Sequence, residues 1–312
     1  MAALAKSAGK PANGLMKRIA HNYDLYLLFL PVIVYYVVFH YVPMYGIVVA
    51  FKDYVPTLGA MKSPWVGLQN FKNFFSSFYF TRIMKNTLGI SFMQLIFGFP
   101  ASIILALFIN ELKNGPFKKV VQNATFIPHF LSTVVIVGMV VAFTKLDSGI
   151  INIIIQAFGG KQVSFMESVS WFKPLFVLSG IWQNMGWDSM IYIGALAGIN
   201  PELFEAASID GASRFQKMIR ISIPCILPTI IILLLLNLGR IMNVGFEKAL
   251  LMQNNLNMDS SDIISTFVYQ RGILRGDYGL STAVGLFNSA INCILLLTTN
   301  KITKMISGSG IF

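Results

Sequence analysis

The segment Glu205-Ala-Ala-Ser-Ile-Asp-Gly211, with Ile221-Ser-Ile-Pro224 after it, is a polar interruption between two long apolar runs. The residues just before it, Asn200-Pro201-Glu202, predict the start of a helix. They supply an N-cap side chain, a proline in the first turn and an acid near the positive end of the helix. We therefore expect a short polar helix followed by a turn.

Small residues shape this helix and its turn. Ala206 and Ala207 keep one helix face thin, so that the backbone of another protein can approach closely. Gly211 permits a backbone turn that a β-carbon would resist. Asp210 is expected to cap a second, basic and amphipathic helix that follows. These features alone would favour an ordinary cytoplasmic helix–turn–helix between two membrane spans.

The composition indicates a membrane protein. The chain has 312 residues, of which 55% are hydrophobic and 12% are charged, and its mean hydropathy is +0.66. Soluble domains carry about twice that charged fraction. We predict an all-α membrane protein in which several spans replace a water-excluded core. The net charge of +11 could suit nucleic acid, but basic residues commonly flank spans on the cytoplasmic side, and we favour that explanation.

Apolar runs predict six transmembrane helices, since crossing a bilayer takes about 20 residues. The first is expected at 25–51, and the other five form a core domain at 83–299. Their approximate bounds are 86–109, 125–143, 174–197, 226–243 and 280–299. The remaining segments are a basic tail at 1–24, an extracellular loop at 52–82, the polar loop at 200–224 and a short tail at 300–312.

Two connecting loops contain apolar pieces that are too short to span. Phe71, Phe74, Phe75 and Phe78 recur at helical spacing, which predicts a short interfacial helix on the outer membrane surface. Packing of these rings against the first span is the alternative. The run 150–158 is predicted to be a surface or re-entrant helix.

Metal and disulfide chemistry is not indicated. Cys225 and Cys293 both lie in apolar runs and are expected to be buried free thiols. The histidines His21, His40 and His129 form no cluster with metal-ligand spacing, so the sequence predicts no metal site.

The polar loop resembles the EAA loop of bacterial ABC importer permeases, whose pattern is Glu-Ala-Ala, three residues, Gly, nine residues and Ile-x-Leu-Pro. The match fails at one spaced position, where Ile223 replaces Leu. The resemblance implies a type I ABC importer permease fold and docking of this loop onto an ATPase. The residues expected to couple the two proteins are Glu205, Ala206, Ala207, Asp210 and Gly211.

Further motifs resemble the LplB-type carbohydrate permeases of Gram-positive bacteria over nearly the whole chain. They are Tyr41-Val-Pro-Met-Tyr-Gly46, Phe51-Lys-Asp53, Trp65-Val-Gly-Leu68, Asn86-Thr-Leu88, Phe126-Ile-Pro-His-Phe130, Gly186-Trp187, Asp210-Gly-Ala-Ser-Arg214 and Gly285-Leu-Phe287. This resemblance implies ATP-driven uptake of oligosaccharides. It also implies a complex with a second homologous permease, two ATPase subunits and an extracellular lipid-anchored sugar-binding protein. ATP and Mg²⁺ would bind to the ATPase subunits, with no cofactor in this chain.

The resemblance also sets the expected orientation. Six spans put both termini on the side of the EAA-like loop, which must meet a cytoplasmic ATPase. The density of Lys and Arg in the shorter loops supports this side modestly. We expect a multi-pass protein of the bacterial cell membrane with both termini in the cytoplasm.

The chain carries no motif for chemistry of its own. No phosphate-binding G-x-x-x-x-G-K-[ST] sequence occurs, so ATP hydrolysis by that mechanism is excluded and no enzyme is expected. An ATP-independent channel or secondary transporter is the alternative function. An intramembrane enzyme is a weaker one, whose ionisable candidates would be Asp188 and Arg240.

The fourth span carries the predicted substrate path. Asn184, Asp188 and Tyr192 recur every four residues and share one face. Polar groups are costly against lipid, so this face should point into the bundle or a wet cavity. Rings can stack on a sugar, and amides and carboxylates can bond its hydroxyls; hydrogen bonding between helices is the alternative role. The full candidate set is Trp182, Gln183, Asn184, Trp187, Asp188 and Tyr192, with Asn237 and Gln94 from neighbouring spans.

Overall fold

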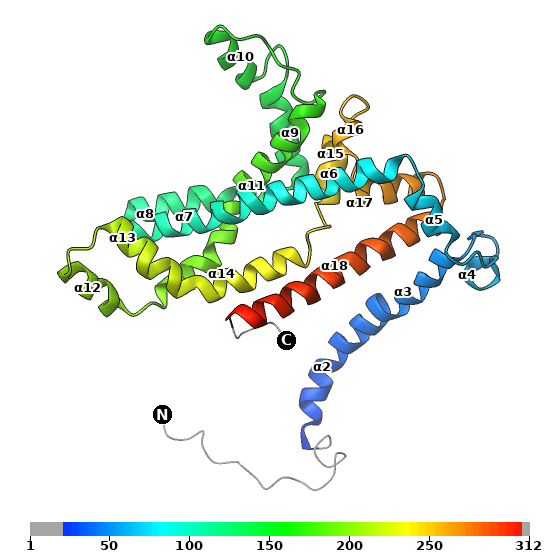
Figure 1. The fold of residues 1–312 in the computed structure, drawn as a ribbon, viewed down its shortest axis with the longest axis horizontal. Coiled ribbons are helices and arrows are strands. Elements are labelled where there is room, and N and C mark those ends of the chain that lie inside the picture. The colour runs from blue at the N-terminus through cyan, green and yellow to red at the C-terminus, as the bar shows by residue number, and fades with distance from the viewer. Residues whose placement is uncertain (1–20, 308–312) are drawn as a thin grey trace.

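The computed structural model describes residues 21–307, and within this range the backbone is helical apart from its connections and one isolated bridge between Lys52 and Trp65 (Figure 1). The basic tail expected at 1–24 lies outside the described residues except for its last four. The end of the tail expected at 300–312 also lies outside them, and its first part continues helix α18.

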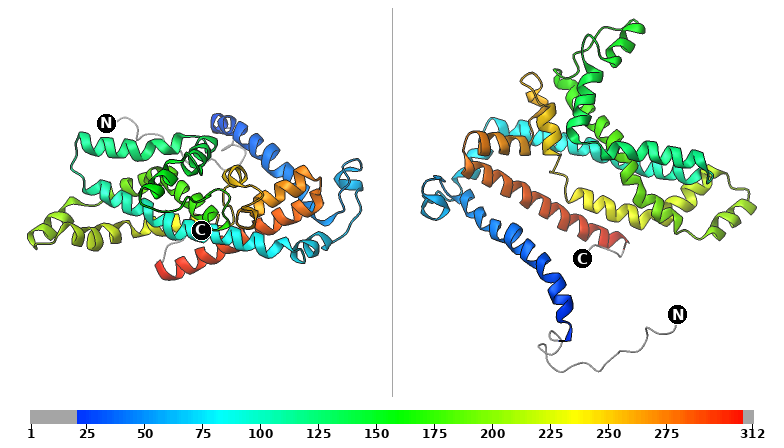
Figure 2. Two further views of the ribbon diagram at one scale, coloured as in Figure 1. Left: turned by 90° about the horizontal axis from the view of Figure 1, so that it is seen from above. Right: turned by 180° about the vertical axis from the view of Figure 1, so that it is seen from behind.

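The first span is one helical run, Tyr23–Phe51. It comprises α2 (Tyr23–Tyr36), a π-helical turn η1 (Val37–Tyr41), α3 (Val42–Met44) and a 3-10 segment η2 (Tyr45–Phe51). No residue of α2 is buried, although the helix is apolar on all sides. Such a helix is stable only against lipid or another protein. Figure 1 and the right-hand view of Figure 2 show α2 leaving the rest of the bundle.

The connection that follows contains α4 (Gly59–Lys62) and α5 (Gln69–Phe75). Its aromatic residues divide between packing and exposure. Phe74 is 1% exposed and meets Phe80, Phe267 and Phe287 edge-on or tilted. Phe78 is 84% exposed. Phe74 therefore packs in the core against α6, α17 and α18, and it is Phe71 that contacts the first span, with its ring 5.5 Å from that of Phe51.

The second span is longer than expected. It runs through α6 (Tyr79–Met93), the π-helical turn η3 (Gln94–Gly98) and α7 (Phe99–Glu111). The π-helical turn lies just before Pro100, which has no N–H for the usual helical hydrogen bond. Gln94 begins this turn and lines a cavity between the helices.

The third span, expected as one helix at 125–143, is broken, and that expectation is wrong. Helix α8 (Pro116–Phe126) and the 3-10 turn η4 (Ile127–Phe130) meet α9 (Thr133–Thr144) at a bend of 102°. Pro128 disfavours helix at this point, and Ser132 caps the new helix by accepting a hydrogen bond from Val135 N. Helix α10 (Ile150–Ala157) follows, at the tip of an arm that projects from the bundle (Figure 2).

Helix α11 (Val169–Ala197) forms the centre of the molecule. It packs against α7, α8, α14 and α16. The remaining elements are α12 (Pro201–Ile209), α13 (Arg214–Lys217), η5 (Met218–Ser222), α14 (Ile223–Leu238), α15 (Phe246–Met252), α16 (Met258–Ser261), α17 (Ile264–Val268), η6 (Tyr269–Leu274) and α18 (Tyr278–Ser307). Helices α12 and α13 lie at one end of the molecule, and α4 and α5 lie at the other (Figure 1).

Four described helical runs are long and apolar enough to cross a membrane: Tyr23–Phe51, Tyr79–Glu111, Arg214–Leu238 and Tyr278–Ile302. The bent α8–α9 pair brings the number to five if it is one span. Helix α11 has 29 residues, enough length for a sixth, but its amides and Asp188 lower its hydropathy. The fold is therefore an all-helical membrane fold with α11, whose amides and acid interrupt its apolar surface, at the centre.

Both cysteines are free, but they are exposed and not buried as expected. Cys225 lies on α14 and Cys293 on α18, two of the membrane-crossing runs. In a membrane an apolar run need not face the protein interior, because lipid tails are as apolar as a core. Hydrophobicity alone therefore could not predict burial here.

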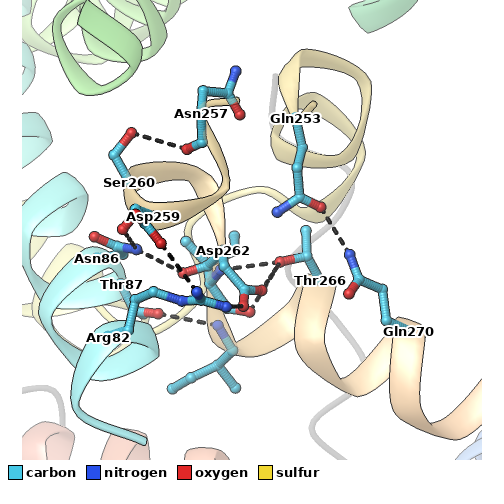
Figure 3. Close-up of polar contacts among 12 residues, drawn as sticks. Arg82, Asn86, Thr87, Gln253, Asn257, Asp259, Ser260, Asp262, Thr266 and Gln270 are labelled. Carbon is cyan, nitrogen blue, oxygen red and sulfur yellow. Dashed lines mark hydrogen bonds and ion pairs between the residues drawn. The ribbon is translucent and has the colours of Figure 1, made fainter. Parts of the chain in front are cut away.

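A polar network fixes the segment after the fifth span to α6 (Figure 3). The guanidinium of Arg82 bonds Asp262 at 2.8 Å and Asp259 at 3.1 Å. The amide of Asn86 donates to the carbonyls of both aspartates, and the Thr87 hydroxyl accepts from Ile264 N at 3.1 Å. The network orders α16 and α17, in the segment between the fifth and sixth predicted spans, where the sequence analysis predicted no helix.

Candidate functional site

A cavity of about 380 Å³ opens between η3 and α7 on one side, α11 on another and the end of α14 on the third. Its apolar lining includes Leu95, Phe99 and Leu233. Its polar side chains come from all three walls: Ser91, Gln94, Ser102, Asn184, Asp188, Tyr192, Asn237, Arg240 and Asn243. The mixture of amides, hydroxyls, one acid and one base can hydrogen-bond a polar ligand from several directions.

The structure separates the candidate residues of α11 into two groups, the predicted face and an adjacent stripe that carries Gln183 and Trp187. Asn184, Asp188 and Tyr192 line the cavity, as do Gln94 and Asn237 from the neighbouring helices. These five side chains come from three elements that are distant in sequence. The face predicted from the four-residue spacing is thus the face that meets the cavity.

The adjacent stripe lies outside this cavity. The amide of Gln183 donates to the carbonyl of Leu131 at 3.2 Å. The Trp187 ring stacks on the ring of His129, with centroids 4.5 Å apart and planes 6° from parallel. Trp182 is 41% exposed and is absent from the cavity lining. Gln183 and Trp187 hold α11 against the α8–α9 bend, which is the packing role considered as the alternative.

One cavity residue is oriented by this packing. The Oδ1 atom of Asn184 lies 3.0 Å from Nδ1 of His129, and its Nδ2 donates to the Gly180 carbonyl at 3.1 Å. Because an amide oxygen can only accept, His129 must carry a proton on Nδ1 in this contact. Helices α8 and α11 also approach each other closely at Gly186, where an added β-carbon would clash with the Thr125 carbonyl oxygen.

A tight turn presents Arg240 to the cavity. The Ser91 hydroxyl donates to the carbonyl of Ile241. The Oδ1 atom of Asn292 on α18 accepts from Met242 N at 3.2 Å. Anchors on α6 and α18 therefore hold the turn from both sides. The sequence placed Arg240 only as an ionisable residue near the end of an apolar run.

Lys248 was not anticipated from the sequence. It lies on α15, which is too short to span a membrane, and it is 8% exposed. Its ammonium donates to the Phe176 carbonyl at 2.9 Å and lies 4.8 Å from the centroid of the Phe176 ring. Burial lowers the pKa of Lys248 to about 8. No sequence signal marks it, because a lysine in the connection between two predicted spans normally faces water.

The EAA-like loop forms a second candidate site at the end of the molecule. Asn200 caps α12 by accepting a hydrogen bond from Glu202 N, as its sequence predicted. Glu205 and Ala206 are exposed, and Gly211 adopts φ +75° in the turn. Asp210, expected to cap the second helix, instead ends α12.

The cap of the second helix is Ser213. Its hydroxyl accepts from Gln216 N, and the Gln216 side chain accepts from Ser213 N at 2.7 Å. This reciprocal pair satisfies two backbone donors, which a cap at Asp210 would not reach from the far side of the turn. Around the turn, Ile209 is 87% exposed and Phe215 is 66% exposed. An apolar pair beside a polar helix is typical of a protein-docking surface.

Among the described residues, no group of three or more His, Cys, Asp or Glu side chains could hold a metal ion. The arrangement can bind a polar solute in the cavity and a protein at the α12–α13 end. Some 20 to 30 Å of helix separates the two regions, judged from the rise of about 1.5 Å per residue along α14.

Known proteins resemble this chain over nearly all its length. Residues 98–304 match the family described as the binding-protein-dependent transport system inner membrane component. Protein LplB of Bacillus subtilis is 43% identical over 92% of this chain and 91% of its own length. The polygalacturonan/rhamnogalacturonan transport system permease protein YteP of the same organism is 41% identical over 96% and 92%.

A solved structure has the same fold. It is a chain of the bacterial alginate ABC transporter in complex with an alginate pentasaccharide-bound periplasmic protein. The similarity has a TM-score of 0.89 at 38% sequence identity, and covers 95% of this chain and 99% of that one.

Proposed function

This chain belongs to the family of binding-protein-dependent transport system inner membrane components, and we propose that it forms one half of the pore of an ATP-driven oligosaccharide importer. It is an ABC transporter permease with the importer permease fold. The observation that carries the proposal is the polar cavity between α7, α11 and α14 in an otherwise apolar helical fold. Its amides and hydroxyls suit the hydroxyls of a sugar.

The polar side chains that line the cavity favour a path for a sugar through the membrane. It brings together Asn184 and Asp188 on α11 with Gln94 on η3 and Asn237 on α14. Each group would otherwise face lipid at a high cost, so together they favour a wet path. Asn184, Asp188, Tyr192, Asn237 and Gln94 are the side chains that we propose to contact the sugar.

Coupling to ATP hydrolysis is proposed for the EAA-like loop. Glu205 and Ala206 are exposed on α12, and Gly211 turns the chain toward α13. With Ala207 and Asp210 they would dock into a groove of an ATPase subunit, with Glu205 facing a basic group there. ATP and Mg²⁺ would bind to that subunit. The exposed Ile209 and Phe215 supply apolar area for the contact.

The proposed complex has a second, homologous permease, two ATPase subunits and an extracellular lipid-anchored sugar-binding protein. Two features of this chain support a second permease. Helix α2 has no buried residue, and Asn237 and Arg240 in the cavity lining are exposed. A partner helix placed against that open side would close the cavity. The chain would lie in the bacterial cell membrane with both termini in the cytoplasm.

The proposal is tested by reconstituting the chain with its partner permease, its ATPase and its sugar-binding protein in liposomes. Oligosaccharide uptake should require ATP on the ATPase side and sugar on the binding-protein side. Uptake that continues without ATP would favour the channel or secondary transporter instead. Omission of this chain alone is the matched control for leakage.

A further inference from the structure

Two side chains of opposite charge line the cavity from different walls. Asp188 lies on α11, and Arg240 lies in the turn that follows α14. Among the described residues the only ion pairs within 4 Å are those of Arg82, so Asp188 and Arg240 are not paired with each other in this arrangement. Charged side chains at membrane depth are costly unless they pair or face a wet cavity. The open cavity meets that condition, and a closed one would not.

The basic side chain that packs beside this part of α11 is committed elsewhere. His129 stacks on Trp187, the neighbour of Asp188 in the chain, and its Nδ1 lies 3.0 Å from Oδ1 of Asn184. The proton on Nδ1 therefore serves Asn184 and not Asp188. Arg240 is the one arginine or lysine among the residues that line the cavity with Asp188.

The packing of α11 against α14 brings these two charges to neighbouring levels. Helix α11 runs toward the α12–α13 end of the molecule and α14 runs away from it (Figure 1). Tyr192 of α11 and Leu233 of α14 belong to one hydrophobic cluster. From that level Asp188 lies about 6 Å back along α11, and Arg240 lies about 10 Å further along the chain of α14, at about 1.5 Å per residue. Less than one helical turn separates the two levels, an offset that a long arginine side chain can bridge.

The turn that carries Arg240 is anchored to helices other than α11. Its backbone is bonded to side chains of α6 and α18, and Asn288 of α18 also donates to Oδ1 of Asn243 at 3.1 Å. A movement of α11 against α6 and α18 would therefore change the separation between Asp188 and Arg240. The turn follows the end of α14 that is remote from α12 and α13.

We propose that Asp188 and Arg240 form an ion pair that closes the empty cavity on the side remote from the ATPase. This inference rests on the proposed function, in which α12 and α13 face the ATPase, and it adds a seal to the same path. A guanidinium matches a carboxylate with two parallel N–H donors. Sugar hydroxyls can donate to the carboxylate and accept from the guanidinium, so an entering sugar would replace the pair.

The test measures leakage through the resting complex, without ATP and without the sugar-binding protein. Proteoliposomes that contain the assembled complex are loaded with radiolabelled raffinose, an uncharged trisaccharide, and its efflux is followed. The single variants are Asp188→Asn and Arg240→Gln, which remove each charge with little change in size. The double variant exchanges the charges, with Asp188→Arg and Arg240→Asp in one chain.

Each single variant should raise the efflux rate by about tenfold, as expected for the loss of a hydrogen bond between charged groups. The double variant restores the pair with its polarity reversed, and its efflux should return close to that of the wild type. Trp182→Ala is the matched control, because Trp182 lies on α11 but outside the cavity lining, and its efflux should equal that of the wild type. Co-purification of the partner subunits shows that each variant assembles.

Efflux at the wild-type rate in both single variants would overturn the inference, as would equal leakage in Trp182→Ala. A double variant that leaks as fast as the single ones would also overturn it, by assigning the partner of each charge to another group. If the double variant fails to assemble, Arg240→Asp decides: two acids in the cavity should leak faster than Arg240→Gln, and equal rates would contradict the pair. None of these measurements uses ATP, so a wild-type complex without ATP-dependent uptake would count against the proposed function and not against the seal.

Discussion

The guanidinium of Arg82 lies 2.8 Å from the carboxylate of Asp262, which is 180 residues further along the chain. The Asp262 side chain is 3% exposed. The contact joins the start of α6 to the segment between the fifth and last spans, as seen in Figure 3. With the bonds of Asn86 and Thr87, the ion pair fixes α16 and α17 against α6.

Arg82→Met should destabilise the protein strongly. Removing one partner leaves the Asp262 charge buried and unpaired, which costs about 3–5 kcal/mol. Asp259→Asn is the control, because the Asp259 side chain is 75% exposed and an exposed pair contributes about 1 kcal/mol or less. Thermal unfolding of the purified complex measures both. Equal melting temperatures for the two variants would contradict the account of this network.

Asn184→Ala should lower oligosaccharide uptake while the complex still assembles. The substitution removes a cavity amide that His129 orients. Trp182→Ala is the control, since Trp182 is on the same helix but outside the cavity, and its uptake should stay close to that of the wild type. Uptake of radiolabelled sugar into proteoliposomes gives both values. Equal loss in the two variants would remove the reason to assign the path to this face.

Gly211→Val should uncouple transport from ATP hydrolysis. Gly211 has φ +75°, and forcing a β-branched residue into that region costs about 1–3 kcal/mol. The strain would move α13 relative to α12 at the proposed docking surface. Sugar-stimulated ATP hydrolysis should fall. Glu205→Gln, an exposed substitution, should have a smaller effect. Normal stimulation in both variants would rule out a docking role.

The sequence predicted the helical membrane class and one face of the site, for physical reasons that can be named. Long apolar runs are specified locally, and so is the four-residue spacing of Asn184, Asp188 and Tyr192 on α11. Nothing in that spacing distinguishes a cavity wall from a contact between helices. Gln183 and Trp187, on the adjacent stripe of α11, pack on the α8–α9 bend.

Properties that depend on distant contacts escaped prediction. Arg82 and Asp262 lie far apart in the sequence, so no local pattern could pair them. Lys248 is buried because α15 folds onto α11. The exposure of Cys225 and Cys293 depends on which helix face meets lipid or a partner. Pro128 was visible, but its 102° bend depends on how α8 and α9 pack.

The most direct test of the central claim is uptake by the reconstituted importer with and without this chain. Liposomes containing this chain, its partner permease and the ATPase should accumulate oligosaccharide when the sugar-binding protein is outside and ATP is supplied to the ATPase. Liposomes containing this chain alone should accumulate none. Accumulation by the chain alone, or by the complex without ATP, would contradict the account of a half-pore driven by a partner ATPase.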